Sequence, residues 1–338
     1  MKRLIVLAIL GLILSSTATS GILGDYLKVK ASLESRKTSG STLLHLTFTE
    51  RFSYFYYNDL TQFDSEIECP LDTYMGGGNL SLIGKLKGDL NWSLNLSYFT
   101  NLQDPDTPTT DSDWQKSLTY DFDEMTVYSE SDVTLRATDI DINVEFDFAN
   151  KPKFSISGAL GYMYQKFEFE AIGLDGWFLI YENDQFDSLN FQSHEDTLVG
   201  INQYTYHIPY IALKSQIRAL NPVSLNANIG FSPLTFGRDF DDHVLRNKEG
   251  RGTCSGATLI LSGDIEWPFK KSANGSSISL SLGYRYLSIS TAGEQRQEWY
   301  GDDPASPNYD DTGDFYRGLD YDLKSTQKSI TFSITGTF

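Results

Sequence analysis

The last eleven residues of the chain, "KSITFSITGTF" at positions 328–338, alternate strictly between two kinds of side chain. The apolar positions are Ile330, Phe332, Ile334, Gly336 and Phe338, and the hydroxyl positions are Ser329, Thr331, Ser333, Thr335 and Thr337. A period of two predicts a β-strand, and these two faces indicate lipid on one side and a polar interior on the other. A strand of a soluble sandwich is the alternative for this stretch taken alone.

Similar alternating runs recur at 41–58, 71–86, 91–100, 135–148, 153–171, 206–219, 223–236, 257–269 and 277–290, which makes ten strands with the last run. Short turns are expected at 85–91, 149–153, 219–223 and 270–276, and long acidic segments at 59–70, 103–132, 172–197, 238–252 and 291–322. This asymmetry is typical of bacterial barrels. The sequence therefore predicts an all-β fold, a ten-stranded antiparallel transmembrane β-barrel with long acidic extracellular loops.

The N-terminal segment has the pattern of a secretory signal. Lys2 and Arg3 precede an apolar run from Leu4 to Leu14, and small residues follow up to Ser20. We expect residues 1–20 to be a signal peptide, 21–40 a periplasmic lead-in and 41–338 the barrel. After residue 20, no apolar run approaches the ~18 residues that a membrane helix needs.

The composition limits the partners. The formal net charge is −18, which argues against nucleic acid as a partner and favours cationic ligands, or else only keeps exposed segments soluble. The 20 Tyr, 21 Phe and 5 Trp residues suit a chain that meets membrane lipid. With two cysteines, Cys69 and Cys254, the chain is no disulfide scaffold, and whether the two pair stays open.

Two short acidic motifs are candidates for chemistry. In "TDSDW", Asp111 and Asp113 point the same way on an extended segment, where they can hold a water or share a proton. In "GRDFDDHVLR", the carboxylate of Asp241 is spaced to orient the imidazole of His243, which can then take a proton from water. Each motif alone is equally compatible with a solvated loop.

Other chemistries compete for these residues. Carboxylates and one histidine can bind zinc, but zinc sites usually draw on more imidazoles than this motif offers. A barrel hydrolase with a serine nucleophile needs a serine beside a histidine. Ser41 with His45 and Ser193 with His194 are the available pairs, and neither has a supporting motif.

These motifs resemble those of the omptin family of outer-membrane endopeptidases. "DSDW" (111–114) matches the family's Asp-x-Asp-Trp, and "DFDDH" (239–243) matches its Asp-x-Asp-Glu-His, with aspartate in place of glutamate. "GINQYTYHIPYIAL" (200–213) is similar to a family strand, and "TER" (49–51) to the segment that carries the family's specificity glutamate.

The resemblance implies a protease without a metal or a covalent intermediate, whose active site lies in an extracellular cleft. His243 would be the general base and Asp241 its orienting partner, with Asp111 and Asp113 on the opposite wall. Family members cleave between two basic residues, so Glu50 and Asp239 would line the pocket for the residue before the cleaved bond. Basic peptides or proteins are the implied substrates.

The family also depends on lipopolysaccharide held on the barrel's outer face. Tyr162 matches this site and Lys166 stands in place of an arginine, while Tyr204 or Thr205 stands where the next strand has an arginine. Outer-membrane lipid is therefore an expected partner, no other cofactor is implied, and a monomer is expected. The alternative function is a non-catalytic adhesin or binding barrel on the same scaffold.

Overall fold

A computed structural model describes residues 27–54, 57–85, 91–119, 123–182, 185–220, 222–272, 276–304 and 310–338, so the expected signal peptide lies outside the described residues. Its strands are β1 (Leu27–Tyr54), β2 (Tyr57–Pro70), β3 (Thr73–Lys85), β4 (Asn91–Asn101), β5 (Thr109–Ser117), β6 (Asp123–Asn150), β7 (Phe154–Glu182), β8 (Gln185–Leu220), β9 (Val223–His243), β10 (Lys248–Lys271), β11 (Ser277–Trp299) and β12 (Phe315–Thr337). A 3₁₀-helix, η2 (Val244–Arg246), joins β9 to β10. Among these residues, no helix is long and apolar enough to cross a membrane.

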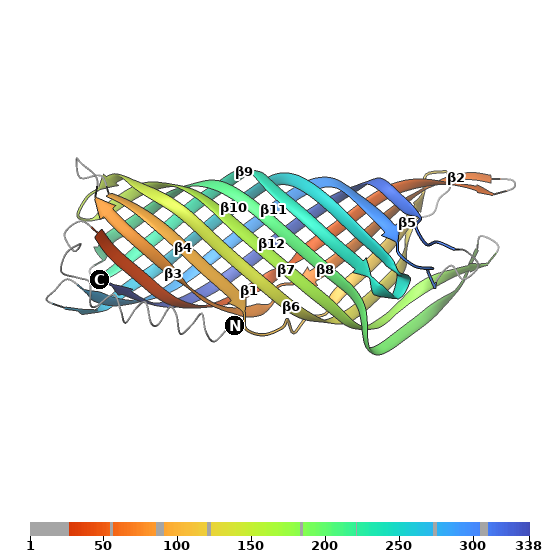
Figure 1. Ribbon diagram of the computed structural model, residues 1–338, viewed down its shortest axis with the longest axis horizontal. Helices are drawn as coiled ribbons and strands as arrows, with labels where there is room; N and C mark the ends of the chain where they lie inside the picture. The colour runs from red at the N-terminus through yellow and green to blue at the C-terminus, as the bar shows by residue number, and fades with distance from the viewer. Residues whose placement is uncertain are drawn as a thin grey trace.

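The strands form one antiparallel sheet that closes on itself (Figure 1). The order is β12-β11-β10-β9-β8-β7-β6-β4-β3-β1-β2-β5, and the pairings β12–β1 and β6–β5 close it. The short connections and the C-terminus lie at one end, called the turn end below, and the long β-hairpins extend beyond the wall at the other, called the hairpin end. The expected all-β antiparallel barrel is confirmed.

The sheet has twelve strands and not the expected ten, because β2 and β5 form in the segments 59–70 and 103–132, which were expected to be loops, and interruptions separate them from β3 and β4. Toward the turn end β1 pairs with β3, and toward the hairpin end it pairs with β2. The interruption lies beside Gly40, which has a φ of +122° and whose carbonyl accepts a hydrogen bond from Leu71 N at 2.8 Å. A side chain is excluded at Gly40, since a Cβ would lie 1.9 Å from the Thr326 carbonyl oxygen.

The second interruption separates β4 from β5 where the chain reads "LQDPDTP", residues 102–108. Proline has no backbone donor for a sheet ladder. Side chains satisfy the exposed edge of β6 instead, since buried backbone groups need partners. Asn101 Nδ2 donates to Leu135 O at 2.5 Å, Asn101 Oδ1 accepts from Ala137 N at 2.9 Å, and Asp104 Oδ1 accepts from Leu135 N at 2.9 Å.

Most residues expected in long loops lie in strands. The segment 59–70 is in β2, 103–132 contains β5 and the start of β6, 172–197 is largely the β7–β8 hairpin, and 291–322 contains the ends of β11 and β12. Within 238–252, only 244–247 leave the strands. The acidic residues lie on the part of the barrel that extends beyond the apolar surface, but the strands remain hydrogen-bonded to one another there. The lead-in is also shorter than expected, because 27–40 lie in β1 and pair with β3 and β12.

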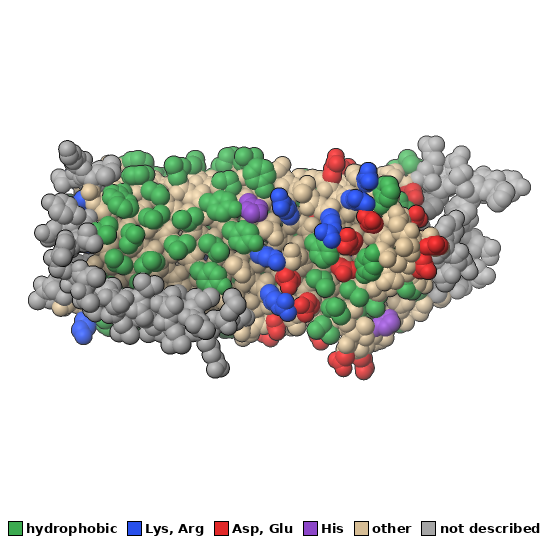
Figure 2. Space-filling view, in the orientation of Figure 1, with side chains coloured by type: hydrophobic (Ala, Val, Ile, Leu, Met, Phe, Trp, Pro, Cys, Tyr) green, Lys and Arg blue, Asp and Glu red, His purple; other side chains and the backbone are tan. Residues whose placement is uncertain are grey.

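The outer surface divides into two halves. Figure 2 shows apolar side chains over the half at the turn end and charged side chains over the half toward the hairpin end. β12 displays the predicted alternation, with Ile330, Phe332 and Ile334 exposed and Ser329 and Ser333 buried inside. The apolar half is the surface that meets the hydrocarbon of a membrane.

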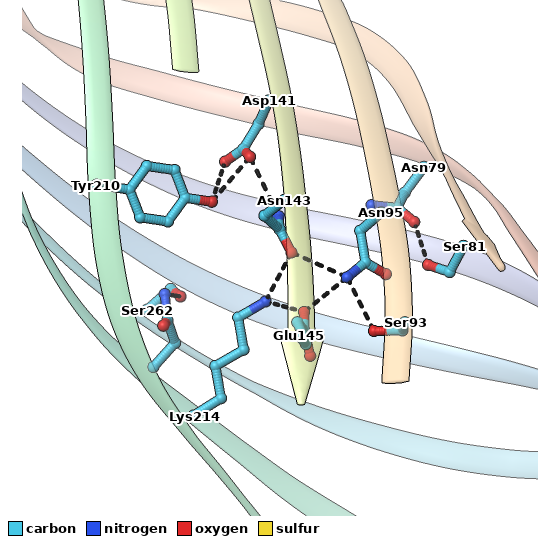
Figure 3. Close-up of polar contacts among 11 residues, drawn as sticks. Asn79, Ser81, Ser93, Asn95, Asp141, Asn143, Glu145, Tyr210, Lys214 and Ser262 are labelled. Carbon is cyan, nitrogen blue, oxygen red and sulfur yellow. Dashed lines mark hydrogen bonds and ion pairs between the residues drawn. The ribbon is translucent and has the colours of Figure 1, made fainter. Parts of the chain in front are cut away.

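Inside the barrel, the turn end encloses a polar cavity of about 900 Å³. Its wall carries a hydrogen-bonded set of side chains, called the lumen network below (Figure 3). The lumen network comprises Asn95, Asp141, Asn143, Glu145, Tyr210 and Lys214. Toward the hairpin end the interior is closed by packed side chains, which include the fully buried Phe99, Tyr204, Tyr206 and Leu323.

Candidate active site

The end of β9 supplies three acidic or basic groups to the interior. Side chains two residues apart in a strand point to the same side, so Asp239, Asp241 and His243 all face inward. His243 Nε2 lies 2.7 Å from Asp241 Oδ2, and Asp241 is only 3% exposed. The expected carboxylate–imidazole pair is therefore formed, on a strand that extends beyond the apolar half of the surface as expected.

A tight turn fixes this pair. β9 ends at His243, η2 follows, and Asn247 adopts a left-handed conformation with a φ of +52° before β10 begins. Arg246 Nε and Nη2 donate to Asp303 Oδ2 at 3.0 and 2.8 Å, which anchors the turn to the segment after β11. The turn places Lys248 directly opposite His243 in the β9–β10 ladder.

β5 supplies the opposite wall of the cleft. It is held between β2 and β6, with Asp111 paired to Ile67 and Ser129. Burial, followed by the negative charge of Asp113, raises the pKa of Asp111 to about 7. The imidazole of His243 acts against this rise, so β5 and the end of β9 lie close enough to interact electrostatically. The fold brings the four residues predicted to be catalytic close to one another.

The Asp111 carboxylate is incompletely satisfied. Its Oδ1 atom is buried and has no hydrogen-bond partner among the described residues. Buried polar atoms in proteins nearly always have partners, and an exception needs an explanation such as a bound water or ligand. Asp111 and Asp113 are therefore suited to hold a water in the cleft.

The floor of the cleft joins the two walls. Cys69 of β2 is completely buried, with Sγ 3.8 Å from the hydroxyl of Tyr204 on β8 and 3.4 Å from Thr109 Oγ1. Burial raises the pKa of Cys69 to about 12, so this thiol stays protonated and is no nucleophile. Cys69 and Cys254 are both free, which answers the question of their pairing.

The two residues predicted to line the specificity pocket are Asp239, on the same strand as Asp241 and His243, and Glu50 on β1. Asp239 is 5% exposed, and its Oδ2 accepts a hydrogen bond from Gln295 Nε2 at 2.8 Å. Its Oδ1 is buried without a partner among the described residues, and burial raises its pKa to about 6. Gly252 makes room for this carboxylate, because a Cβ there would lie 2.2 Å from Asp239 Oδ1.

Glu50 lies at the hairpin end of β1, half-buried and beside Tyr316 of β12. Burial first, and then the charge of Glu50, raise the pKa of Tyr316. The contacts of Asp239 are instead with Gln295 on β11 and Tyr321 on β12. The two predicted pocket residues thus lie against the same strand, β12, at different heights.

The predicted lipid-binding residues lie on the outer wall. Tyr162 is exposed, its hydroxyl lies 2.5 Å from His207 Nδ1, and Lys166 Nζ lies 3.3 Å from Glu168 Oε2. Of the two residues expected at the place of the family's second arginine, Tyr204 points into the barrel and is completely buried, whereas Thr205 is half-buried and lies opposite Lys166 in the β7–β8 ladder. Whether a side chain of β8 points into the barrel or toward the lipid depends on the register of that strand, and the short sequence motif does not show this register.

The rival chemistries find little support. The ring of His45 lies 3.3 Å from Asp64 Oδ1 and 3.4 Å from Thr47 Oγ1, so its closest partners are not Ser41. His194 and Ser193 are both exposed on the β7–β8 hairpin. In the part of the chain that the structure describes, no group of three or more histidine, cysteine or acidic side chains is arranged to hold a metal ion.

Three polar residues at the cleft were not predicted. Asn202 on β8 is buried and pairs with Asp241 in the ladder, Gln295 binds Asp239, and Lys248 lies opposite His243. Lys248 follows His243 by five residues, which was a usable signal. The sequence predicts a long loop over 238–252, and in a loop this spacing does not place two side chains together.

Comparisons with known proteins agree with this arrangement. The model of the Omptin family matches residues 81–307. The chain belongs to the Omptin family. The crystal structure of the outer membrane protease OmpT from Escherichia coli superposes with a TM-score of 0.65 at 16% identity, covering 92% of this chain and 97% of that one.

The outer membrane protein OprG from Pseudomonas aeruginosa is aligned over 92% of this chain and 95% of its own, with a TM-score of 0.29 at 8% identity. No curated protein matches the chain. This omptin is a β-barrel of the bacterial outer membrane.

Proposed function

We propose that this omptin is an endopeptidase that cleaves peptides at basic residues, with its cleft at the hairpin end facing the outside of the cell. The observation that carries the proposal is the 2.7 Å contact between His243 Nε2 and Asp241 Oδ2, opposite a second carboxylate pair. An adhesin has no need of a buried carboxylate–imidazole pair. The likeness of the fold to OmpT, which is an outer membrane protease, agrees with this proposal.

In the proposed mechanism each ring nitrogen of His243 has a separate role. Asp241 accepts the Nε2 proton of His243, which leaves Nδ1 as the basic atom that removes a proton from water. The water sits between this atom and the Asp111–Asp113 pair and attacks the carbonyl carbon of the peptide bond. The imidazolium then returns its proton to the departing amine. A positioned general base contributes ~10²–10⁴-fold in rate.

The buried Asp239 supports specificity for a basic side chain. Its Oδ1 atom has no partner among the described residues, so an arginine or lysine of the substrate would supply the missing donor. Glu50, higher on the barrel wall beside Tyr316, adds a second negative charge along the route into the cleft. The formal charge of −18 would steer basic peptides to this end.

Lipid takes part in the proposal through the outer wall of β7. Tyr162 and Lys166 are four residues apart in one strand and therefore project from the same face, beside the apolar half of the surface. A phosphate of lipopolysaccharide would accept a hydrogen bond from the tyrosine and pair with the lysine. The protein would act as a monomer and needs no metal in this mechanism.

The test is cleavage of a quenched fluorescent peptide containing Arg-Arg by the refolded barrel, with and without lipopolysaccharide. His243→Ala and Asp241→Ala should abolish cleavage between the arginines. A matched control is His45→Ala, because His45 also lies beside an aspartate, Asp64, but outside the cleft. Absence of cleavage by folded wild-type protein with lipid present would reject the protease and favour the adhesin.

A further inference from the structure

Lys248 is a buried cation beside the proposed catalytic pair. It is the first residue of β10, it is only 8% exposed, and it faces His243 across the β9–β10 ladder. On its other side it pairs with Trp299 of β11, and its Nζ lies 5.7 Å from the centre of that ring. Burying an ammonium group is costly unless nearby negative charge compensates for the lost water.

The negative charge comes from both walls of the cleft. Burial and the nearby Arg246 lower the pKa of Lys248, while Asp241, Asp113 and Asp111 act to raise it. The effect is mutual, since Lys248 also opposes the rise in the pKa of Asp111. Lys248 thus interacts electrostatically with carboxylates of both β5 and β9.

The charge balance of the cleft requires such a cation. The carboxyl groups of Asp113 and Asp241 both lie close enough to Asp111 to raise its pKa. Like charges that share a site force one group to keep its proton. A protonated Asp111 has one fewer oxygen with which to accept a hydrogen bond from the attacking water.

We propose that Lys248 is a positioning residue of the hydrolysis, whose ammonium group favours the ionised form of Asp111 so that Asp111 and Asp113 can orient the water opposite His243. The proposal rests on the proposed function and adds a residue to it. The groups that face Asp111 are Asp113 on its own strand, Asp241 and His243 on β9, Lys248 on β10 and the thiol of Cys69 on β2.

The first experiment is the pH dependence of kcat/KM for the Arg-Arg peptide, measured for wild type, Lys248→Met and Lys248→Arg. Methionine keeps the length of the buried chain and removes the charge. Loss of the ammonium should move the acid limb of the profile up by roughly one pH unit, which lowers kcat/KM about tenfold at pH 6. Lys248→Arg should keep the limb near its wild-type position, and Lys324→Met, an exposed lysine of the outer wall, should not move it.

The second experiment needs no substrate. The carboxyl band of Asp111 is isolated by infrared difference between each protein and the same protein carrying Asp111→Asn, and is followed with pH in the wild-type and Lys248→Met backgrounds. The proposal expects Asp111 to titrate at higher pH without Lys248. Circular dichroism and electrophoretic mobility would show that each variant is folded.

The two experiments separate the two levels of inference. Cleavage by wild type with an unmoved acid limb and an unmoved Asp111 titration in Lys248→Met would reject the role of Lys248 and leave the protease standing. Loss of activity at every pH without either shift would likewise reject it, because a structural defect acts in that way. Absence of cleavage by folded wild type would reject the protease, and with it any role of Lys248 in the reaction.

Discussion

The barrel interior contains two sets of carboxylates, and they differ in how completely their oxygens are bonded. In the lumen network, both oxygens of Asp141 accept from the hydroxyl of Tyr210, at 2.8 and 3.1 Å, and Oδ1 also accepts from Asn143 Nδ2 at 3.1 Å. Glu145 forms an ion pair with Lys214 and accepts from Asn95 Nδ2 at 2.7 Å (Figure 3).

The cleft at the hairpin end is built from similar residue types but leaves oxygens free. Oδ1 of Asp111 and Oδ1 of Asp239 are both buried without a partner among the described residues. A fully bonded polar network makes a barrel interior rigid, whereas an incompletely bonded one costs stability unless something else binds there. The lumen network is therefore structural, and the cleft retains binding capacity for water and substrate.

The largest expected effect is on kcat, which should depend on the carboxylates of the cleft and not on those of the lumen network. Asp241→Asn should lower kcat by ~10²–10⁴-fold, because the amide can no longer accept the Nε2 proton and orient His243 for proton transfer. Asp141→Asn in the lumen network should leave kcat within about twofold, since its partners lie in the interior toward the turn end. Equal losses in the two variants, measured with the Arg-Arg peptide, would contradict the division into structural and catalytic carboxylates.

Stability should respond in the opposite way. Lys214→Met removes the ion-pair partner of Glu145 and should lower the free energy of unfolding by ~1–3 kcal/mol. The measurement is reversible urea unfolding in lipid vesicles, followed by tryptophan fluorescence. Lys324→Met is the control, because its exposed pair with Asp322 should contribute less than about 1 kcal/mol. A Lys214→Met barrel as stable as wild type would show that the lumen network is not needed for stability.

Binding of a basic side chain should depend on the ionisation of Asp239. Because burial raises the pKa of Asp239 to about 6, its carboxyl is ionised above that pH and becomes protonated as the pH falls below it. KM for an arginine peptide should therefore rise by roughly tenfold from pH 7.5 to pH 5, the loss of one charge-assisted hydrogen bond. Asp239→Asn should show a high KM at both values. A steeper rise in that variant than in wild type would assign the pH dependence to another group.

The smallest expected effect is on the free energy of unfolding, which the buried carboxyl group of Asp111 lowers when it is ionised. Its pKa of about 7 lies above the value expected in the unfolded chain, so the folded state holds a proton that the unfolded state releases. Its contribution to stability is most favourable below about pH 4 and declines as the pH rises to about 7. Asp111→Asn should thus raise the free energy of unfolding at pH 8 by about 1 kcal/mol while activity falls. An Asp111→Asn barrel less stable than wild type at pH 8 would contradict this expectation.

Local residue patterns predicted much of this molecule. Strict alternation in 328–338 is enough to define a strand with one apolar face, because a strand has a side-chain period of two whatever it pairs with. The spacing of Asp111 and Asp113, and of Asp241 and His243, placed each pair on one side of its strand for the same reason. The sequence also predicted the antiparallel barrel, since alternating runs separated by turns leave few other arrangements.

Only the tertiary structure decided how these strands meet. The register of β10 against β9 puts Lys248 beside His243, the closed sheet brings β5 opposite β9, and β1 pairs along one edge with β3 and then with β2. It also decided that Cys69 and Cys254 stay apart and that the acidic segments remain paired strands. Alternation within a strand is a local property of the backbone, whereas register, closure and the approach of distant charges depend on every strand of the barrel at once.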